Sequence, residues 1–192
     1  MENKQQIWAK TVLVAYKYLG AMCGAIDKLV ESTAKHSYYT SGVWQEKNSI
    51  QSVSKKLIRL SDKKIDYINL KVMVDKVLGK IPKKFATLLI LRYINRVPPE
   101  DIAELNGVSV RSYYRYITKA INEFAVQMKN IGYNYCTMEV RYLTDSFITS
   151  IYDAVLACKR EYDIDEKEAF LMPSPCEMFS FLEKSDLVKV VI

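Results

Sequence analysis

Histidine and closely spaced cysteines are scarce in this sequence, and their scarcity excludes several kinds of site. His36 is the only histidine, and the four cysteines lie far apart, with no CxxC pair. Zinc sites and disulfide frameworks depend on such clusters. We therefore interpret the cysteines as reduced thiols, as expected for a cytoplasmic protein.

The sequence also lacks the short motifs that carry catalysis or hold a nucleotide. It contains no G-x-x-x-x-G-K-[ST], no G-x-G-x-x-G and no G-x-S-x-G. The acidic run from Asp163 to Glu168 is similar to the start of a calcium loop, but the required glycine and the later spaced acid are missing. With a single histidine, no catalytic constellation can be assembled. We expect no enzyme activity, no cofactor and no bound metal.

No apolar run is long enough to span a membrane. The most apolar stretch, residues 11–26, has 16 residues and is interrupted by Lys17. A membrane helix needs about 20 apolar residues. A secretory signal is the alternative interpretation, and Lys17 and the missing small-residue cleavage site argue against it. The sequence therefore predicts no membrane partner.

Helix-breaking residues are few, and charge is unevenly distributed. Glycine and proline together number eleven, while 49% of the residues are hydrophobic, which is typical of a folded, helix-rich protein. Residues 55–129 carry sixteen Lys and Arg against seven Asp and Glu, whereas residues 130–192 carry six against eleven. A basic block is often only a solvated face, but one that coincides with a DNA-reading motif favours a polyanionic partner.

Two long amphipathic segments open the chain. The first, residues 3–35, and the second, residues 49–78, each show apolar residues at steps of three and four, and the polar stretch 36–49 between them is expected to be a loop. We predict an antiparallel helical hairpin over residues 1–80, serving either as core or as a dimerisation arm. The expected buried stripes are Trp8, Val12, Ala15, Leu19, Met22, Ile26 and Leu29, then Ile50, Val53, Leu57, Leu60, Ile65, Ile68 and Val72, with a slip near Ser61.

Residues 81–129 contain the pattern of a helix-turn-helix. A helix from Pro82 to about Asn95 is stopped by Val97-Pro98-Pro99, and a short helix then begins at Pro99. Asn106-Gly107 supplies the turn, because glycine readily adopts the left-handed conformation that ends a helix. The residues expected to be buried here are Phe85, Leu88, Leu89, Leu91, Ile94, Ile102, Ala103, Leu105 and Val108.

The second helix of the motif is predicted from about Val110 to Gln127, with Ser109 as its N-cap. Its buried face is expected to hold Tyr113, Ile117, Ala120, Ile121 and Phe124, and its exposed face Arg111, Arg115, Thr118 and Asn122. The major groove admits one helix, and side chains near that helix's N-terminus reach the base edges. The pattern therefore favours a DNA-reading helix.

The run LRYINRVPPEDIAELNGVSVRSYYRYITKAI, residues 91–121, resembles region 4 of the bacterial sigma-70 family. The stretch from about residue 5 to 127 is also similar in architecture to small phage and prophage transcription regulators. The resemblance implies base contacts by Val110, Arg111, Tyr114 and Arg115. Val110 stands where sigma factors usually have a polar or basic residue, so a different sequence preference is expected. No segment resembles the sigma domain that melts promoters, and we do not expect a complete sigma factor.

Cationic and hydroxyl side chains around the motif are candidates for contacts with DNA phosphates. Ser109 can also present its backbone N–H to a phosphate. The alternative for the lysines and arginines is a solvated helix face. The candidates are Lys83, Lys84, Arg92, Arg96, Ser109, Ser112 and Lys119.

Residues 130–192 are predicted to form an acidic helical extension. A helix is expected from Met138 to Glu161, with a short helix over 177–184 and a β-prone end. The extension is too apolar for a disordered tail, and it can pack on the basic middle, form a dimer interface or sense a signal.

The sequence thus predicts an all-α fold composed of the hairpin, the sigma-region-4-like helix-turn-helix and the C-terminal helical extension. The expected function is sequence-specific binding of double-stranded DNA in transcription control by a homodimer, since dimers read paired half-sites, with RNA polymerase as a further partner. The alternative is an anti-sigma-like or polymerase-binding regulator that uses the same motif on protein.

Overall fold

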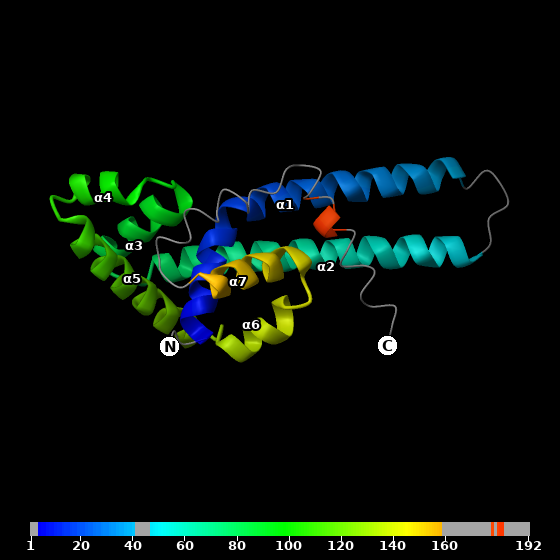
Figure 1. Cartoon of the computed structure of the whole chain (residues 1–192). Helices are drawn as coiled ribbons and strands as arrows, with labels where there is room; N and C mark the ends of the chain where they lie inside the picture. The colour runs from blue at the N-terminus through cyan, green and yellow to red at the C-terminus, as the bar shows by residue number, and fades with distance from the viewer. Residues whose placement is uncertain (1–3, 41–46, 159–177, 179, 183–192) are drawn as a thin grey trace. The chain divides into compact units, whose positions relative to one another are not determined.

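Helices are the regular elements of the part of the chain that the structure describes. The computed structural model describes residues 4–40, 47–158, 178 and 180–182. Within these ranges it contains no strand, so the all-α prediction is confirmed. The elements are α1 (Lys4–Thr40), α2 (Lys47–Leu78), α3 (Lys83–Leu89), the π-helix η1 (Ile90–Ile94), α4 (Pro99–Leu105), α5 (Val110–Asn130), α6 (Tyr135–Tyr142) and α7 (Ser146–Ala157) (Figure 1).

The chain divides into two compact units. One comprises residues 18–71, and the other comprises residues 1–17 together with 72–192. We refer to residues 18–71 as the hairpin unit and to the remainder as the main unit. The division into three functional segments at residues 80 and 129 stays a prediction.

The hairpin unit consists of parts of α1 and α2 lying side by side (Figure 1). Leu19, Met22 and Ile26 of α1 are fully buried, as the sequence predicts. Both helices are longer than expected: α1 continues to Thr40 and α2 begins at Lys47. The loop predicted over residues 36–49 is therefore wrong at both ends, because the polar side chains there do not prevent helix formation.

The predicted stripe on the second half of α2 is also wrong. Leu60 is buried as predicted, but Ile65, Ile68 and Val72 are exposed, and the buried set continues instead with Tyr67, Leu70, Val74 and Val77. This set keeps helical spacing without a slip, but its track passes beside two lysines. Lys63 places its ammonium 5.9 Å from the Tyr67 ring centroid, and Lys64 donates to Asp27 at 2.6 Å. Long lysine stems can pack along apolar surface while the charge stays in water, so both lysines lie half-buried beside the apolar stripe.

The main unit joins the beginning of α1 to the late helices. Trp8 is fully buried, and its ring centroid lies 4.7 Å from that of Tyr152 on α7. Lys4 forms an ion pair with Glu139 of α6 at 3.0 Å, which raises the pKa of Lys4 through the hydrogen bond and the charge. Residues 130–157 thus contribute helices to a packed core, which agrees with the predicted helical extension.

The single helix expected from Met138 to Glu161 is two helices within the described residues. The side chain of Asp145 accepts hydrogen bonds from the backbone N–H groups of Phe147 and Ile148, both at 3.0 Å, and so begins α7 as an N-cap. The periodicity alone did not reveal this interruption. Ser146 donates to the carbonyl of Phe181 at 2.7 Å, which holds that short segment against α7. The acidic run 163–168 and the β-prone end lie outside the described residues.

Within the described ranges, no helix combines the length and the apolarity needed to cross a membrane.

Candidate nucleic-acid interface

The α3–α5 segment, residues 83–130, begins with a helix whose last turn is wide. The N–H of Asn95 donates to the carbonyl of Ile90 at 2.9 Å, which closes an i to i+5 turn in η1. A π-turn inserts one residue into the helical repeat, so every later side chain is rotated relative to a regular α-helix.

Arg92 lies on the buried face of this helix, four residues after Leu88 and three after Leu89, which are both buried. It is only 4% exposed, and its guanidinium lies 5.9 Å from the Tyr93 ring centroid, while Leu91 and Ile94 are only half-buried. The prediction of a phosphate contact by Arg92 placed Leu91 and Ile94 on the buried face in its stead. We correct that prediction and leave Arg92 out of the interface.

Helix α4 begins with Pro99 at its first turn, as predicted, and buries Ile102 and Ala103. Leu105 was expected to join them, but it is 72% exposed. The helix ends at this residue, so Leu105 points outward with the acids of the same helix. The exposed acids of α4 are Glu100, Asp101 and Glu104.

The connection between α4 and α5 follows the sequence prediction closely. Gly107 has a φ of +61°, in the left-handed region, and its N–H donates to the carbonyl of Glu104 at 2.9 Å. Ser109 caps α5: its hydroxyl oxygen accepts from the N–H of Ser112 at 3.2 Å. Val108 between them is half-buried. A glycine turn and a serine cap thus fix where α5 starts.

Replacing Gly107 by alanine is expected to destabilise the main unit by about 1–2 kcal/mol, because a left-handed L-residue is strained. No heavy atom lies within 4 Å of the position that the new Cβ would take, so the cost comes from the backbone alone. The midpoint of chemical denaturation measures it. Gly107→Asn is the matched control, since asparagine tolerates this conformation better; equal losses for both variants would contradict the explanation.

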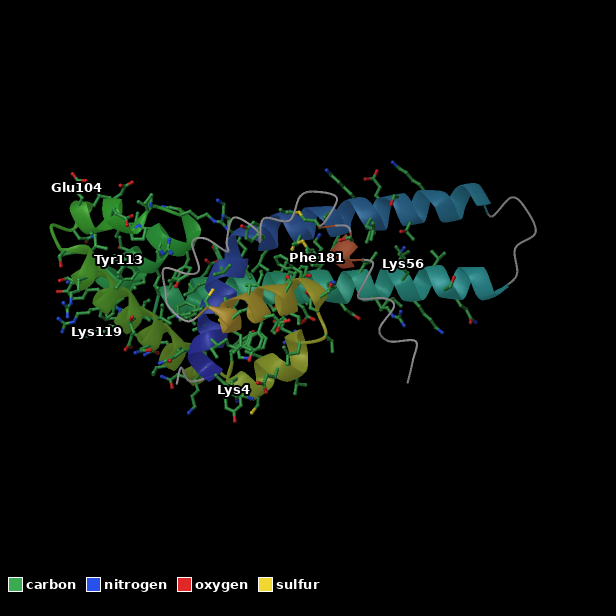
Figure 2. The ribbon with its side chains drawn as sticks, in the orientation of Figure 1. Lys4, Lys56, Glu104, Tyr113, Lys119 and Phe181 are labelled. Carbon is green, nitrogen blue, oxygen red and sulfur yellow. The ribbon has the colours of Figure 1, made fainter. Side chains whose placement is uncertain are left out.

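Helix α5 separates an apolar face from a polar one. All the predicted core residues are buried, and all the predicted outer residues are exposed. In Figure 2, Tyr113 lies among the helices, whereas Lys119 of α5 and Glu104 of α4 extend outward. The buried set is Tyr113, Ile117, Ala120, Ile121 and Phe124, and the exposed set is Arg111, Arg115, Thr118 and Asn122.

The four candidate base contacts lie in the first two turns of α5. Arg111 and Arg115 are exposed, and Val110 is 37% exposed. Tyr114 is half-buried, and its ring packs edge-on against Tyr113 with centroids 5.2 Å apart. The guanidinium groups of Arg111 and Arg115 therefore lie one helical turn apart. The side chain of Val110 and the half-buried ring of Tyr114 lie in the same two turns.

The candidate phosphate contacts are not all alike. Lys83, Lys84 and Lys119 are exposed, and Lys84 lies over the Tyr116 ring, 4.5 Å from its centroid. The hydroxyls of Ser109 and Ser112 are 3.0 Å apart and hydrogen-bond to each other. Lys83 and Lys84 thus lie on α3, Lys119 lies on α5, and the two serine hydroxyls lie at the start of α5.

Arg96 differs from those candidates. It is half-buried and holds a φ of +56°, an unusual conformation for a residue other than glycine. The sequence did not predict this conformation. It follows the wide turn of η1 and redirects the chain toward Pro98 and α4.

Sequence reasoning missed Lys129, because the helix was expected to end at Gln127. Helix α5 continues to Asn130, and Lys129 lines an open cleft of about 520 Å³. The cleft lies between α5, the first turn of α1 and the start of α6, and also contains Gln6, whose amide donates to Asn122. Only the extra helical turn brings a cation to this end of α5.

Among the described residues, no group of three or more His, Cys, Asp or Glu side chains comes together as a metal site. No protein-family model, curated protein or solved structure matches this chain.

Proposed function

We propose that this protein is a sequence-specific DNA-binding transcription regulator and that the α3–α5 segment is its helix-turn-helix. The observation that carries the proposal is the polar face of α5. Arg111 and Arg115 are exposed on the first turns of a capped helix whose opposite face is fully buried. A rigid helix that presents arginines near its N-terminus fits the major groove, where arginine recognises guanine.

The charges around α5 support the same arrangement. Lys83, Lys84 and Lys119 are exposed and suit contacts with the phosphates on either side of the groove. The acids of α4 would repel phosphates, so the proposed docking surface is α5 with α3 and not the outer face of α4. The resemblance of residues 91–121 to sigma region 4 agrees with this assignment, and two copies are proposed to read paired half-sites.

Binding to DNA duplexes selected from a random pool tests the proposal. We expect retardation in a gel-shift assay and a steep loss of affinity with salt. Neutralising four phosphates would weaken binding about 100-fold between roughly 50 and 200 mM salt, because bound counterions are released. Absence of any binding at the low-salt end would contradict the proposal.

A second candidate is a module that binds RNA polymerase or another protein through α4. The observation that favours it is Leu105, which is 72% exposed beside the acidic side chain of Glu104. An apolar side chain within an acidic surface suits a protein partner with basic residues around a pocket. A Leu105→Lys variant that loses purified bacterial RNA polymerase while keeping DNA binding would support this function, and unchanged polymerase binding would contradict it.

A further inference from the structure

The cleft of about 520 Å³ in the main unit opens where the first turn of α1, the last turns of α5 and the start of α6 meet (Figure 1). Small-molecule sites in proteins are concave and typically measure about 300–1,000 Å³. The cleft is therefore large enough for a small organic molecule. The proposed base contacts on the first turns of α5 do not line it.

One wall of the cleft is a single face of α5. Asn122, Val126 and Lys129 follow each other at steps of four and three residues, and all three are exposed. Ala125 lies beside them and is buried. An amide and an ammonium thus lie on either side of an apolar patch, which suits a ligand with a carbon skeleton.

The positive charge of the cleft has no acidic counterpart in its lining. Lys129 supplies an ammonium, and none of the described residues that line the cleft is an aspartate or a glutamate. Glu139 of α6, the next acid along the chain, is paired with Lys4 at 3.0 Å. No acid in the described ranges forms an ion pair with Lys129. The charge of the lining therefore favours an anionic ligand.

The asparagines that line the cleft have donors available for such a ligand. Asn134 caps α6, and its side-chain oxygen accepts from the N–H of Thr137 at 2.9 Å, so its –NH₂ group is the part that can donate to a ligand. The side-chain oxygen of Asn122 accepts from the amide of Gln6, which leaves its –NH₂ group as a second donor. Two amide donors and an ammonium suit the oxygens of a carboxylate or a phosphate.

We propose that this cleft binds a small organic anion, a carboxylate or a phosphate monoester, through Lys129, Asn122 and Asn134. The lysine supplies the charge, the two asparagines donate hydrogen bonds to oxygens of the ligand, and Val126 contacts its carbon skeleton. The site goes beyond the proposed function and does not depend on it.

The phosphates of DNA are the alternative anion for Lys129. From Arg115 to Lys129 there are 14 residues (129 − 115), which is about 21 Å along the helix at about 1.5 Å per residue. The major groove is about 12 Å wide and about 8.5 Å deep. In the proposed DNA complex, α5 therefore holds Lys129 outside the groove that its first turns enter.

NMR titration of the full chain tests the proposal with three anions, namely citrate, glucose 6-phosphate and inorganic phosphate, and with glucose as the uncharged control. We expect citrate or glucose 6-phosphate to shift the amide signals of Asn122, Lys129 and Asn134 with a Kd of about 1 mM or below. Which of the two binds distinguishes a carboxylate from a phosphate monoester. Glucose should not bind, and inorganic phosphate should bind more weakly because it has no carbon skeleton.

Lys129→Met removes the ammonium and keeps most of the side-chain length. We expect it to weaken binding of the organic anion about tenfold or more, because a charge-assisted hydrogen bond is lost. Lys80→Met is the matched control, since Lys80 is exposed and lies outside the cleft, and it should bind as wild type does. Affinity for a selected DNA duplex should be the same in both variants.

Three results would overturn the proposal. The first is that neither organic anion binds, or that inorganic phosphate alone does. The second is binding that Lys129→Met leaves unchanged. The third is a Lys129→Met variant that loses affinity for the duplex and keeps the organic anion, which would assign Lys129 to a DNA phosphate.

Discussion

An Arg111→Ala, Arg115→Ala double variant is expected to lose about 2–6 kcal/mol of DNA-binding free energy, which is at least about a 30-fold rise in the dissociation constant. Both side chains are exposed on the first turns of α5, and neither supports the core. Removing the two side chains should therefore leave the free energy of unfolding unchanged. Fluorescence anisotropy with a selected duplex measures the affinity, and thermal unfolding checks the fold.

Two further variants make this result specific. Arg141→Ala removes an exposed arginine of α6 and should leave DNA affinity nearly unchanged. Arg115→Lys keeps the charge but loses the paired donors that recognise guanine. If that variant bound every sequence as tightly as wild type, Arg115 would be a phosphate contact and the assignment of base reading to it would be wrong.

Phe124→Ala is expected to destabilise the main unit by about 3–5 kcal/mol, because it removes a large buried ring and leaves a cavity. Phe124 is fully buried on the apolar face of α5, together with Ile117 and Ala120. Since that face holds α5 in place, DNA affinity should fall as the population of folded protein falls. Denaturant unfolding followed by circular dichroism measures the change.

Val126→Ala is the matched control for this variant. Val126 lies two residues further on the same helix and is mostly exposed, so its truncation should change stability by less than about 0.5 kcal/mol. Similar losses for both variants would contradict burial of the ring as the cause, since alanine has a higher helix propensity than either residue.

The α4–α5 connection could be predicted from sequence because each step has a local cause. Pro99 starts a helix through its fixed φ, Gly107 permits the left-handed turn, and Ser109 supplies a cap. The four-three-four spacing of the α5 core is regular, so the exposed arginines followed from it. These signals depend on neighbours within a few residues and require no knowledge of the rest of the fold.

The sequence predictions that the structure contradicts share a different cause. Arg92 is buried because it follows Leu88 and Leu89 at helical spacing on the face that packs inward, although an arginine is usually exposed. The stripe of α2 was misplaced because Lys63 and Lys64 pack partly against their surroundings, which depends on Tyr67 and Asp27 being near. Leu105 was predicted to be buried because it is apolar and follows Ile102 and Ala103 in the same helix. In each case, packing against residues distant in the sequence decides which side of the helix is buried.

The packing of the first turns of α1 against α6 and α7 has a consequence for synthesis on the ribosome. Gln5 donates to the carbonyl of Tyr133 at 3.0 Å, and Trp8 stacks on Tyr152, so the earliest helical turns find their partners only after more than a hundred further residues have been made. Contacts this distant in sequence form late and slow folding. The apolar residues of Ile7–Ala15 therefore remain without their native cover until α7 has emerged, and a chain stalled before that point would expose them to chaperones and proteases.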